Sequence, residues 1–324
     1  MKRPNPEHRQ PLPIHHPKPR SEDPEAPARI RSIVASPSYR VPDRDPDFLS
    51  RDEMRGIRLM LDYQKPQTLL AENEVGHTIV VFGGTRIPEP ASARRKCEAL
   101  RAALAADPDD RSLREQLDIA ERVLDKSRYY EIAREFGRLV GDCGDKTIGG
   151  RIMVMTGGGP GIMEAANRGA NDAGAKSIGL NIALPHEQFP NPYVTPELCF
   201  SFHYFAIRKL HFLMRARALV AFPGGYGTFD ELFEVLTLAQ TRKINPVPVI
   251  LVGEDYWRRA FDADFLVAEG AIDPEDRDLF WYAESAAEAW RDILTWYELK
   301  GEPLLEPASI ADGYPPPDAA TGEE

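Results

Sequence analysis

The sequence predicts an α/β fold in which a parallel β-sheet is covered by helices on both faces. Short apolar, β-branched runs such as residues 77–82 and 218–222 alternate along the chain with longer amphipathic segments. Two of the apolar runs end in glycine-rich turns, at residues 156–161 and 223–227, and each turn leads into a helical pattern. Apolar strands that alternate with helices are typical of parallel sheets buried on both sides.

The individual elements follow in order from periodicity and from turn residues. Strands are expected at residues 77–82, 151–155, 177–184, 218–222 and 247–252. Helices are expected at residues 129–140, 160–173, 205–217, 229–240, 256–269 and 284–297. Ser50 and Glu53 have the spacing of a capping box, which predicts the start of an earlier helix. Residues 91–126 are rich in Ala, Leu, Arg and Glu and are interrupted at Pro108, so they predict a helical hairpin.

Proline divides the chain of 324 residues into a core and two tails. Eleven of the 29 prolines lie in residues 1–50 and five more lie in residues 301–324. We therefore expect a disordered tail over residues 1–47, a folded domain over residues 48–300 and a flexible tail from residue 301 onward. The hairpin at residues 91–126 is expected to be an insertion in that domain.

Composition argues against several classes of partner. A net charge of −11 disfavours nucleic-acid binding through phosphates, and no uncharged apolar stretch is long enough to span a membrane. The polar residues 1–20 do not resemble a secretory signal. Cys97, Cys143 and Cys199 are too widely spaced for a disulfide framework or a metal-binding pair, which fits the cytoplasm. We expect neither a metal nor another cofactor.

The first glycine-rich turn contains Gly157, Gly158, Gly159 and Gly161. Ile162 stands where a dinucleotide-binding fingerprint needs its third glycine, and no Gly-Lys-Ser/Thr sequence follows as in a Walker A loop. The turn therefore predicts neither NAD nor a P-loop. It is either a ligand contact or a tight turn with no further role.

The second turn has the composition of a phosphate-binding loop. Gly224, Gly225 and Gly227 allow close approach of the backbone to an anion, and Thr228 adds a hydroxyl before a helix. Thr228 and Glu231 also have the spacing of a capping box. Glu231 therefore has two interpretations, as a helix cap or as a catalytic carboxylate.

A basic cluster lies between these two turns. Arg208, His211 and Arg215 share one face of the predicted helix, and Lys209 is adjacent. The cluster is either a solvated basic stripe or an anion site. A Schiff-base role for Lys209 has no supporting pyridoxal-phosphate signature in the chain.

Together these motifs resemble the Lonely Guy (LOG) family of cytokinin riboside 5′-monophosphate phosphoribohydrolases, whose members are often labelled lysine decarboxylases. The resemblance covers roughly residues 77–298, apart from the insertion. It implies a Rossmann-like fold, a homodimer or larger homo-oligomer, and hydrolysis of the N-glycosidic bond of a purine nucleoside 5′-monophosphate. The N-terminal extension, residues 1–76, and the insertion resemble those of longer bacterial-type members, for which AMP is a more plausible substrate than a plant hormone. The hairpin at residues 91–126 either packs against a partner chain or is a surface addition.

The resemblance also implies roles for particular residues. Arg208 and Glu231 match the catalytic pair of the family. Glu231 would hold the ribose hydroxyls or orient water, and Arg208 would support charge on the leaving base or grip the phosphate. Substrate contacts are implied for Gly157, Gly158, Gly159, Met163, Glu164, Lys209, Gly224, Gly225, Gly227 and Thr228. The alternative is a non-catalytic carrier of a nucleotide or of the molybdenum cofactor, which the presence of both Arg208 and Glu231 disfavours.

Overall fold

The computed structural model describes residues 15–144, 151–183 and 189–305. Two compact units are present, Met1–Arg58 and Leu59–Glu324. The predicted flexible tail from residue 301 lies almost entirely outside the described residues, as do the first 14 residues of the predicted disordered tail.

The first unit contains short helices where the sequence predicted disorder. They are α1 (Ala26–Ala35), α2 (Pro46–Leu49) and three single 3₁₀ turns. The prediction is wrong for α1, which begins with Pro27 in its first turn, where a fixed φ favours helix initiation. The predicted capping box at Ser50 is also wrong, because Ser50 directly follows α2 and its hydroxyl donates to the carbonyl of Asp47.

The second unit is built on a seven-stranded, all-parallel sheet with strand order β4-β3-β2-β1-β5-β6-β7. This confirms the predicted Rossmann-like, doubly wound fold. The strands are β1 (Val75–Phe82), β2 (Arg151–Thr156), β3 (Ser177–Ile182), β4 (Cys199–Phe202), β5 (Ala216–Ala221), β6 (Val249–Val252) and β7 (Trp281–Ala283). The edge strands β4 and β7 are missing from the sequence prediction, because four and three residues give too short a pattern to recognise.

The order of the strands reverses at β1. Ile79 of β1 pairs with Val154 of β2 on one side and with Ala218 of β5 on the other. The chain therefore winds away from β1 in both directions. In open α/β sheets, ligands bind beyond the carboxyl ends of the strands at such a reversal. The turns that follow β1, β2 and β5 are consequently expected to form the ligand site.

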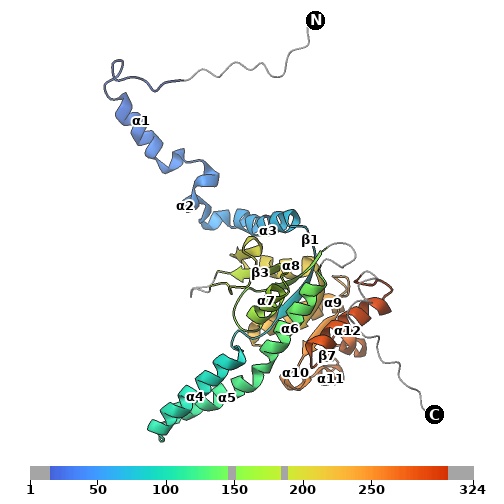
Figure 1. Cartoon of the computed structure of the whole chain (residues 1–324). Helices are drawn as coiled ribbons and strands as arrows, with labels where there is room; N and C mark the ends of the chain where they lie inside the picture. The colour runs from blue at the N-terminus through green and yellow to red at the C-terminus, as the bar shows by residue number, and fades with distance from the viewer. Residues whose placement is uncertain (1–14, 145–150, 184–188, 306–324) are drawn as a thin grey trace, which may run out of the picture. The chain divides into compact units, whose positions relative to one another are not determined.

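Helices cover both faces of the sheet (Figure 1). Ile79 and Val81 of β1 belong to one apolar core, whereas Val80 and Phe82 belong to the other, as the alternation of a strand requires. The first core is completed by α6 (Arg128–Asp142), α7 (Ile162–Asp172) and α12 (Ala286–Leu299). The second core includes residues of α3 (Arg55–Glu72), α8 (Phe205–Met214), α9 (Tyr226–Gln240) and α10 (Glu254–Ala260).

The predicted helical hairpin is confirmed. Helices α4 (Pro90–Ala106) and α5 (Arg111–Lys126) lie side by side (Figure 1). The carboxylate of Asp110 accepts a hydrogen bond of 3.0 Å from the amide of Leu113 and so caps the start of α5. Only Ser127 separates α5 from α6, so the hairpin is joined directly to the body of the unit.

The helix expected over residues 256–269 is instead two helices, α10 and α11 (Ala263–Ala268). Helix α11 has its own cap, because the Asp262 carboxylate accepts from the amide of Phe265. Helix α8 also ends earlier than predicted, at Met214, since the chain enters β5 at Ala216.

Candidate active site

A cleft of about 840 Å³ lies at the carboxyl ends of β1, β2 and β5. Gly83 and Gly84 line it from the turn after β1, and Gly157 lines it from the turn after β2. The loop after β5 contributes its residues from Pro223 to Thr228. The cleft therefore occupies the place that the reversal of strand order indicates.

The loop after β5 has the geometry of an anion site. Gly225 is the N-cap of α9 and no side chain caps the helix. The first bond into the helix is from the amide of Phe229 to the carbonyl of Gly225, so the amides of Tyr226, Gly227 and Thr228 precede the helical ladder. These amides and the helix dipole together favour a phosphate or carboxylate.

Gly224 is fixed by close packing within this loop. A Cβ atom at this position would lie 2.2 Å from the hydroxyl oxygen of Thr228, so no larger residue fits without moving the loop. The carbonyl of Gly224 accepts a hydrogen bond from the phenol of Tyr256, on α10. The loop is thus held from both sides, which predisposes it to present its amides in one arrangement.

The structure rules out one of the two interpretations of Glu231, that of a helix cap. Helix α9 begins at Tyr226, so Thr228 lies inside the first turn and is not the N-cap. The predicted capping box is therefore wrong, because the helix starts earlier than its apolar pattern indicates. Glu231 instead accepts a hydrogen bond of 2.6 Å from the guanidinium of Arg208.

Arg208 and Glu231 form a buried ion pair that lines the cleft. Each side chain is only 11 % exposed, and the two come from α8 and α9. The guanidinium carbon of Arg208 also lies 5.0 Å from the ring centroid of Phe205. Within the described part of the chain, the buried Nε of Arg208 has no hydrogen-bond partner. The ion pair therefore includes one hydrogen-bond donor, the Nε of Arg208, that is buried but not hydrogen-bonded.

Burial raises the pKa of Glu231 from 4.5 to about 7, although the charge of Arg208 opposes this shift. The carboxyl group therefore changes its charge near neutral pH. A carboxylate with such a pKa suits proton transfer or stabilisation of a developing cation.

Four of the predicted contact residues do not line the cleft. Gly158 and Gly159 instead bind Asn191. The backbone amide of Asn191 donates to the carbonyl of Gly158 at 2.8 Å, and its side-chain amide donates to the carbonyl of Gly159 at 3.0 Å. The carboxylate of Glu164 accepts from the phenol of Tyr130 at 2.8 Å. From the first glycine-rich turn, only Gly157 and Met163 line the cleft. This turn mainly joins β2 to α7, so its glycine pattern is chiefly a packing signal.

Lys209 is the fourth of these residues. Its ammonium nitrogen lies 2.7 Å from the carboxylate of Asp230 and 3.3 Å from that of Glu234. The predicted basic stripe is also not one surface. His211 is fully buried against the carbonyl of Tyr63, and Arg215 bonds to Gln67. Arg208 alone of this cluster faces the cleft.

Sequence reasoning missed the contribution of the inserted hairpin to the cleft. Ile119, Arg122, Val123 and Lys126 line it from α5. Their spacing of i, i+3, i+4 and i+7 places them on one helix face, and this spacing is the signal that could have identified them. Ile119 is 60 % exposed, so its apolar side chain is accessible from the cleft that it lines. The further lining residues that the site prediction did not name are Phe82, Gly83, Gly84, Thr85, Arg86, Ile87, Ile182, Phe205, Pro223, Tyr226 and Tyr256.

The described residues contain neither a candidate metal site nor a candidate membrane-spanning helix. Among the described residues, no group of three or more His, Cys, Asp or Glu side chains is placed to hold a metal ion. In the same residues, no helix has both the length and the apolar character that a membrane crossing requires.

Fold and cleft define a parallel α/β protein that presents a helix N-terminus for an anion beside a buried Arg–Glu pair. The chain belongs to the lysine decarboxylase-like (LOG) family. The family model described as "Possible lysine decarboxylase" matches residues 163–293. That range includes both members of the ion pair and the loop after β5.

Named relatives support this assignment. A cytokinin riboside 5′-monophosphate phosphoribohydrolase of Arabidopsis thaliana is 31 % identical over 152 residues, which are 45 % of this chain and 69 % of that protein. A protein of the same name from Oryza sativa is 31 % identical over 50 % of this chain and 65 % of its own length. Another rice relative is 33 % identical, and the match spans only 55 % of its length.

Solved structures resemble the chain more distantly. A molybdenum-cofactor carrier protein of Chlamydomonas reinhardtii is 22 % identical, with a TM-score of 0.36, over 53 % of this chain and 89 % of that one.

Proposed function

We propose that the protein hydrolyses the N-glycosidic bond of a purine nucleoside 5′-monophosphate, AMP or an N6-modified AMP, to the free base and ribose 5-phosphate. The observation that supports this most strongly is the buried Arg208–Glu231 pair in the same cleft as the uncapped N-terminus of α9. The names of the relatives point to the same reaction class.

The 5′-phosphate is expected to bind at the start of α9. Tyr226, Gly227 and Thr228 offer backbone amides there, and Thr228 adds its hydroxyl. Binding energy from the phosphate, which does not react, holds the scissile bond against the catalytic pair.

The reaction breaks the bond between C1′ of the ribose and N9 of the base, and it forms a bond from C1′ to a water oxygen. Positive charge develops on the ribose as the bond to the base lengthens. Glu231 in its carboxylate form stabilises that charge and accepts a proton from the attacking water. Arg208 holds the carboxylate in place, and its positive charge stabilises the electron pair that collects on the base. The proton that Glu231 takes from water is passed on to the departing base, which leaves as the neutral purine, and Glu231 returns to its carboxylate form.

The walls of the cleft suit a purine. Apolar side chains line the cleft together with the catalytic pair and come from β1, the loop after β1, α8 and the inserted helix α5. They are Phe82, Ile87, Phe205, Ile119 and Val123. Aromatic bases bury favourably against such surfaces, and an N6 substituent would add further apolar area.

A substrate panel tests the proposal. Purified protein is incubated separately with AMP, N6-isopentenyl-AMP, GMP, CMP and adenosine, and release of the free base is followed by chromatography. We expect turnover of an adenine monophosphate and none of adenosine, because adenosine lacks the phosphate. Tight binding of a monophosphate without release of base from any member would contradict hydrolysis and favour the carrier alternative.

The pKa of Glu231 predicts the pH dependence of the reaction. If the carboxylate is the working form, kcat/KM for AMP rises as the pH increases from 6 to 8, with a midpoint set by the raised pKa of about 7. The measurement is a pH profile of initial rates at low AMP concentration. A profile that is flat through this range would show that ionisation of Glu231 does not limit the reaction.

The ionisation of Glu231 should also affect the stability of the protein. Its contribution to the free energy of unfolding should fall as the pH rises, whereas kcat/KM should rise. The native state holds the Glu231 proton up to about pH 7, whereas in the unfolded chain the proton leaves near the ordinary pKa of 4.5. Between these values the native state binds more protons, so this residue's contribution to the free energy of unfolding falls as the pH rises. Chemical unfolding of the wild type and of Glu231→Gln at pH 5 and pH 7.5 isolates this contribution.

A further inference from the structure

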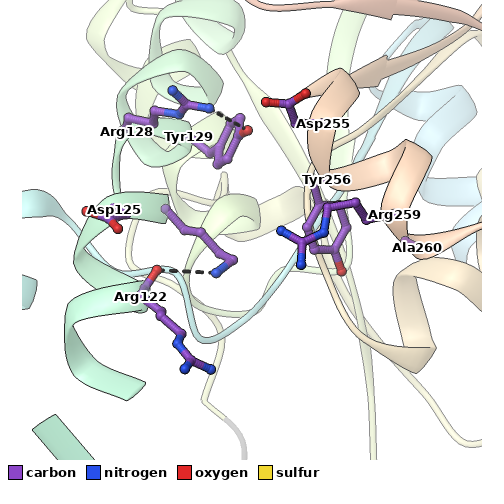
Figure 2. Close-up of a pocket in the computed structure, with 9 residues that line it drawn as sticks. Arg122, Asp125, Arg128, Tyr129, Asp255, Tyr256, Arg259 and Ala260 are labelled. Carbon is purple, nitrogen blue, oxygen red and sulfur yellow. Dashed lines mark hydrogen bonds between the residues drawn. The ribbon is translucent and has the colours of Figure 1, made fainter. Parts of the chain in front are cut away.

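A second cleft, of about 1070 Å³, lies next to the candidate active site. It is bounded by the end of α5 and the start of α6 on one side and by α10 on the other (Figure 2). Arg122, Lys126 and Tyr256 line both clefts, so the two are neighbours that share a wall. Nothing in the proposed hydrolysis uses this second cleft.

The second cleft is strongly basic in an acidic protein. Four cationic side chains line it, against the two carboxylates of Asp125 and Asp255. The four are Arg122, Lys126, Arg128 and Arg259. The whole chain has a net charge of −11, so a local excess of positive charge stands out from the remainder of the protein.

The four cations have acidic neighbours, because Glu284 and Asp255 both interact electrostatically with Arg128. In the described part of the chain, none of them forms an ion pair with a carboxylate. Lys126 donates to the backbone carbonyl of Arg122, and Arg128 donates to the phenol of Tyr129 (Figure 2). Arg258, which adjoins Arg259 on α10, is instead paired with Glu254 at 2.6 Å and does not line this cleft.

The arrangement suits several phosphates better than one. The cations come from opposite walls, and Arg259 reaches from α10 into the gap toward α5 (Figure 2). Arginine side chains bind phosphate oxygens through planar, bidentate hydrogen bonds. An anion that carries several phosphates can therefore contact cations of both walls at once.

The shared wall also links the second cleft to the phosphate loop of the first. Tyr256 lies three residues before Arg259 on α10, and its hydroxyl donates to the carbonyl of Gly224. Gly224 is packed tightly against Thr228, which lines the first cleft. A ligand that pulls α10 toward α5 would therefore act on the loop through one hydrogen bond.

We propose that the second cleft is a binding site for an oligophosphate-bearing small molecule, which adjusts the first site through Tyr256 and Gly224. The binding claim does not depend on the proposed hydrolysis. The coupling claim rests on the proposed function in one respect: a nucleoside monophosphate is taken as the ligand of the first cleft.

Binding is tested by calorimetric titration of the full chain with inorganic tripolyphosphate and, separately, with ATP. Arg128 and Arg259 line only the second cleft, so the double variant Arg128→Gln/Arg259→Gln should weaken binding of both probes at least tenfold. The control Arg258→Gln removes a charge from the adjacent position and should bind as the wild type does. Tighter binding of ATP than of tripolyphosphate would support a nucleotide ligand, and equal binding would support recognition of the phosphates alone.

Equal affinities in the double variant and in Arg258→Gln would overturn the proposal, as would the absence of measurable binding to the wild type. Coupling is tested by measuring AMP affinity with and without saturating tripolyphosphate. The wild type should show a change in affinity, and Tyr256→Phe should bind tripolyphosphate normally but lose that change. An unchanged effect in Tyr256→Phe would contradict the route through Gly224, even if the hydrolase proposal had failed on its own assay.

Discussion

Replacement of Glu231 by Gln is expected to reduce kcat for AMP hydrolysis by about a hundredfold to ten-thousandfold. Glutamine has nearly the same shape, and it can still accept the hydrogen bond that Arg208 donates. It carries no negative charge, so it can neither stabilise a cationic ribose nor accept a proton from water. KM should change little, because the phosphate is expected to bind at the start of α9.

A matched control lies on the same helix. Glu234 is three residues further along α9 and pairs with Lys209 outside the cleft, so Glu234→Gln should retain near-normal turnover. Thermal unfolding of both variants establishes that each is folded. If Glu231→Gln were folded and hydrolysed AMP within threefold of the wild-type rate, Glu231 would not be the catalytic carboxylate.

Replacement of Arg208 by Ala is expected to have the second large effect, on activity and on stability together. Removing one partner of a buried ion pair typically costs about 3–5 kcal/mol of stability, because the remaining charge is left without compensation. Without Arg208, which lowers the pKa of Glu231, that pKa should rise further. Turnover at pH 7 should then be lost, since most molecules would carry a neutral Glu231.

The pH dependence of this variant separates the electrostatic explanation from simple loss of packing. At pH 5 Glu231 is largely protonated even in the wild type, so the destabilisation by Arg208→Ala should be smaller at pH 5 than at pH 8. Lys209→Ala, at the adjacent exposed ion pair, is the control and should cost less than about 1 kcal/mol. An equal loss of stability at both pH values would indicate that Arg208 contributes through packing alone.

Most of the sheet could be predicted from the sequence because its strands are local apolar patterns that end in recognisable turns. β1 consists almost entirely of buried residues, as do the last four residues of β5, and such runs are visible without knowledge of their neighbours. β4 and β7 could not be predicted, since three or four residues carry no period. Helix α1 contradicts the predicted disorder because a proline in the first turn of a helix favours its start, whereas a high proline content predicts disorder.

The candidate site was predicted in part. Arg208, Glu231, Gly157, Met163 and the glycine-rich loop were expected in one place, and they line one cleft. Whether Glu231 caps α9 depends on where that helix begins, and the apolar pattern misplaced its start by three residues. Lys209 was misassigned because adjacent positions on a helix point in different directions. The hairpin residues were missed because only the tertiary structure brings α5 over the loop after β5.

The most direct test of the central claim is the stoichiometry of the products from AMP. Purified full-length protein is incubated with AMP, adenine is quantified by chromatography, and ribose 5-phosphate is quantified with an independent enzymatic assay. The account predicts equimolar adenine and ribose 5-phosphate from the wild type and neither product from Glu231→Gln. Full recovery of unreacted AMP from the wild type, at pH 8 and at stoichiometric enzyme, would contradict it.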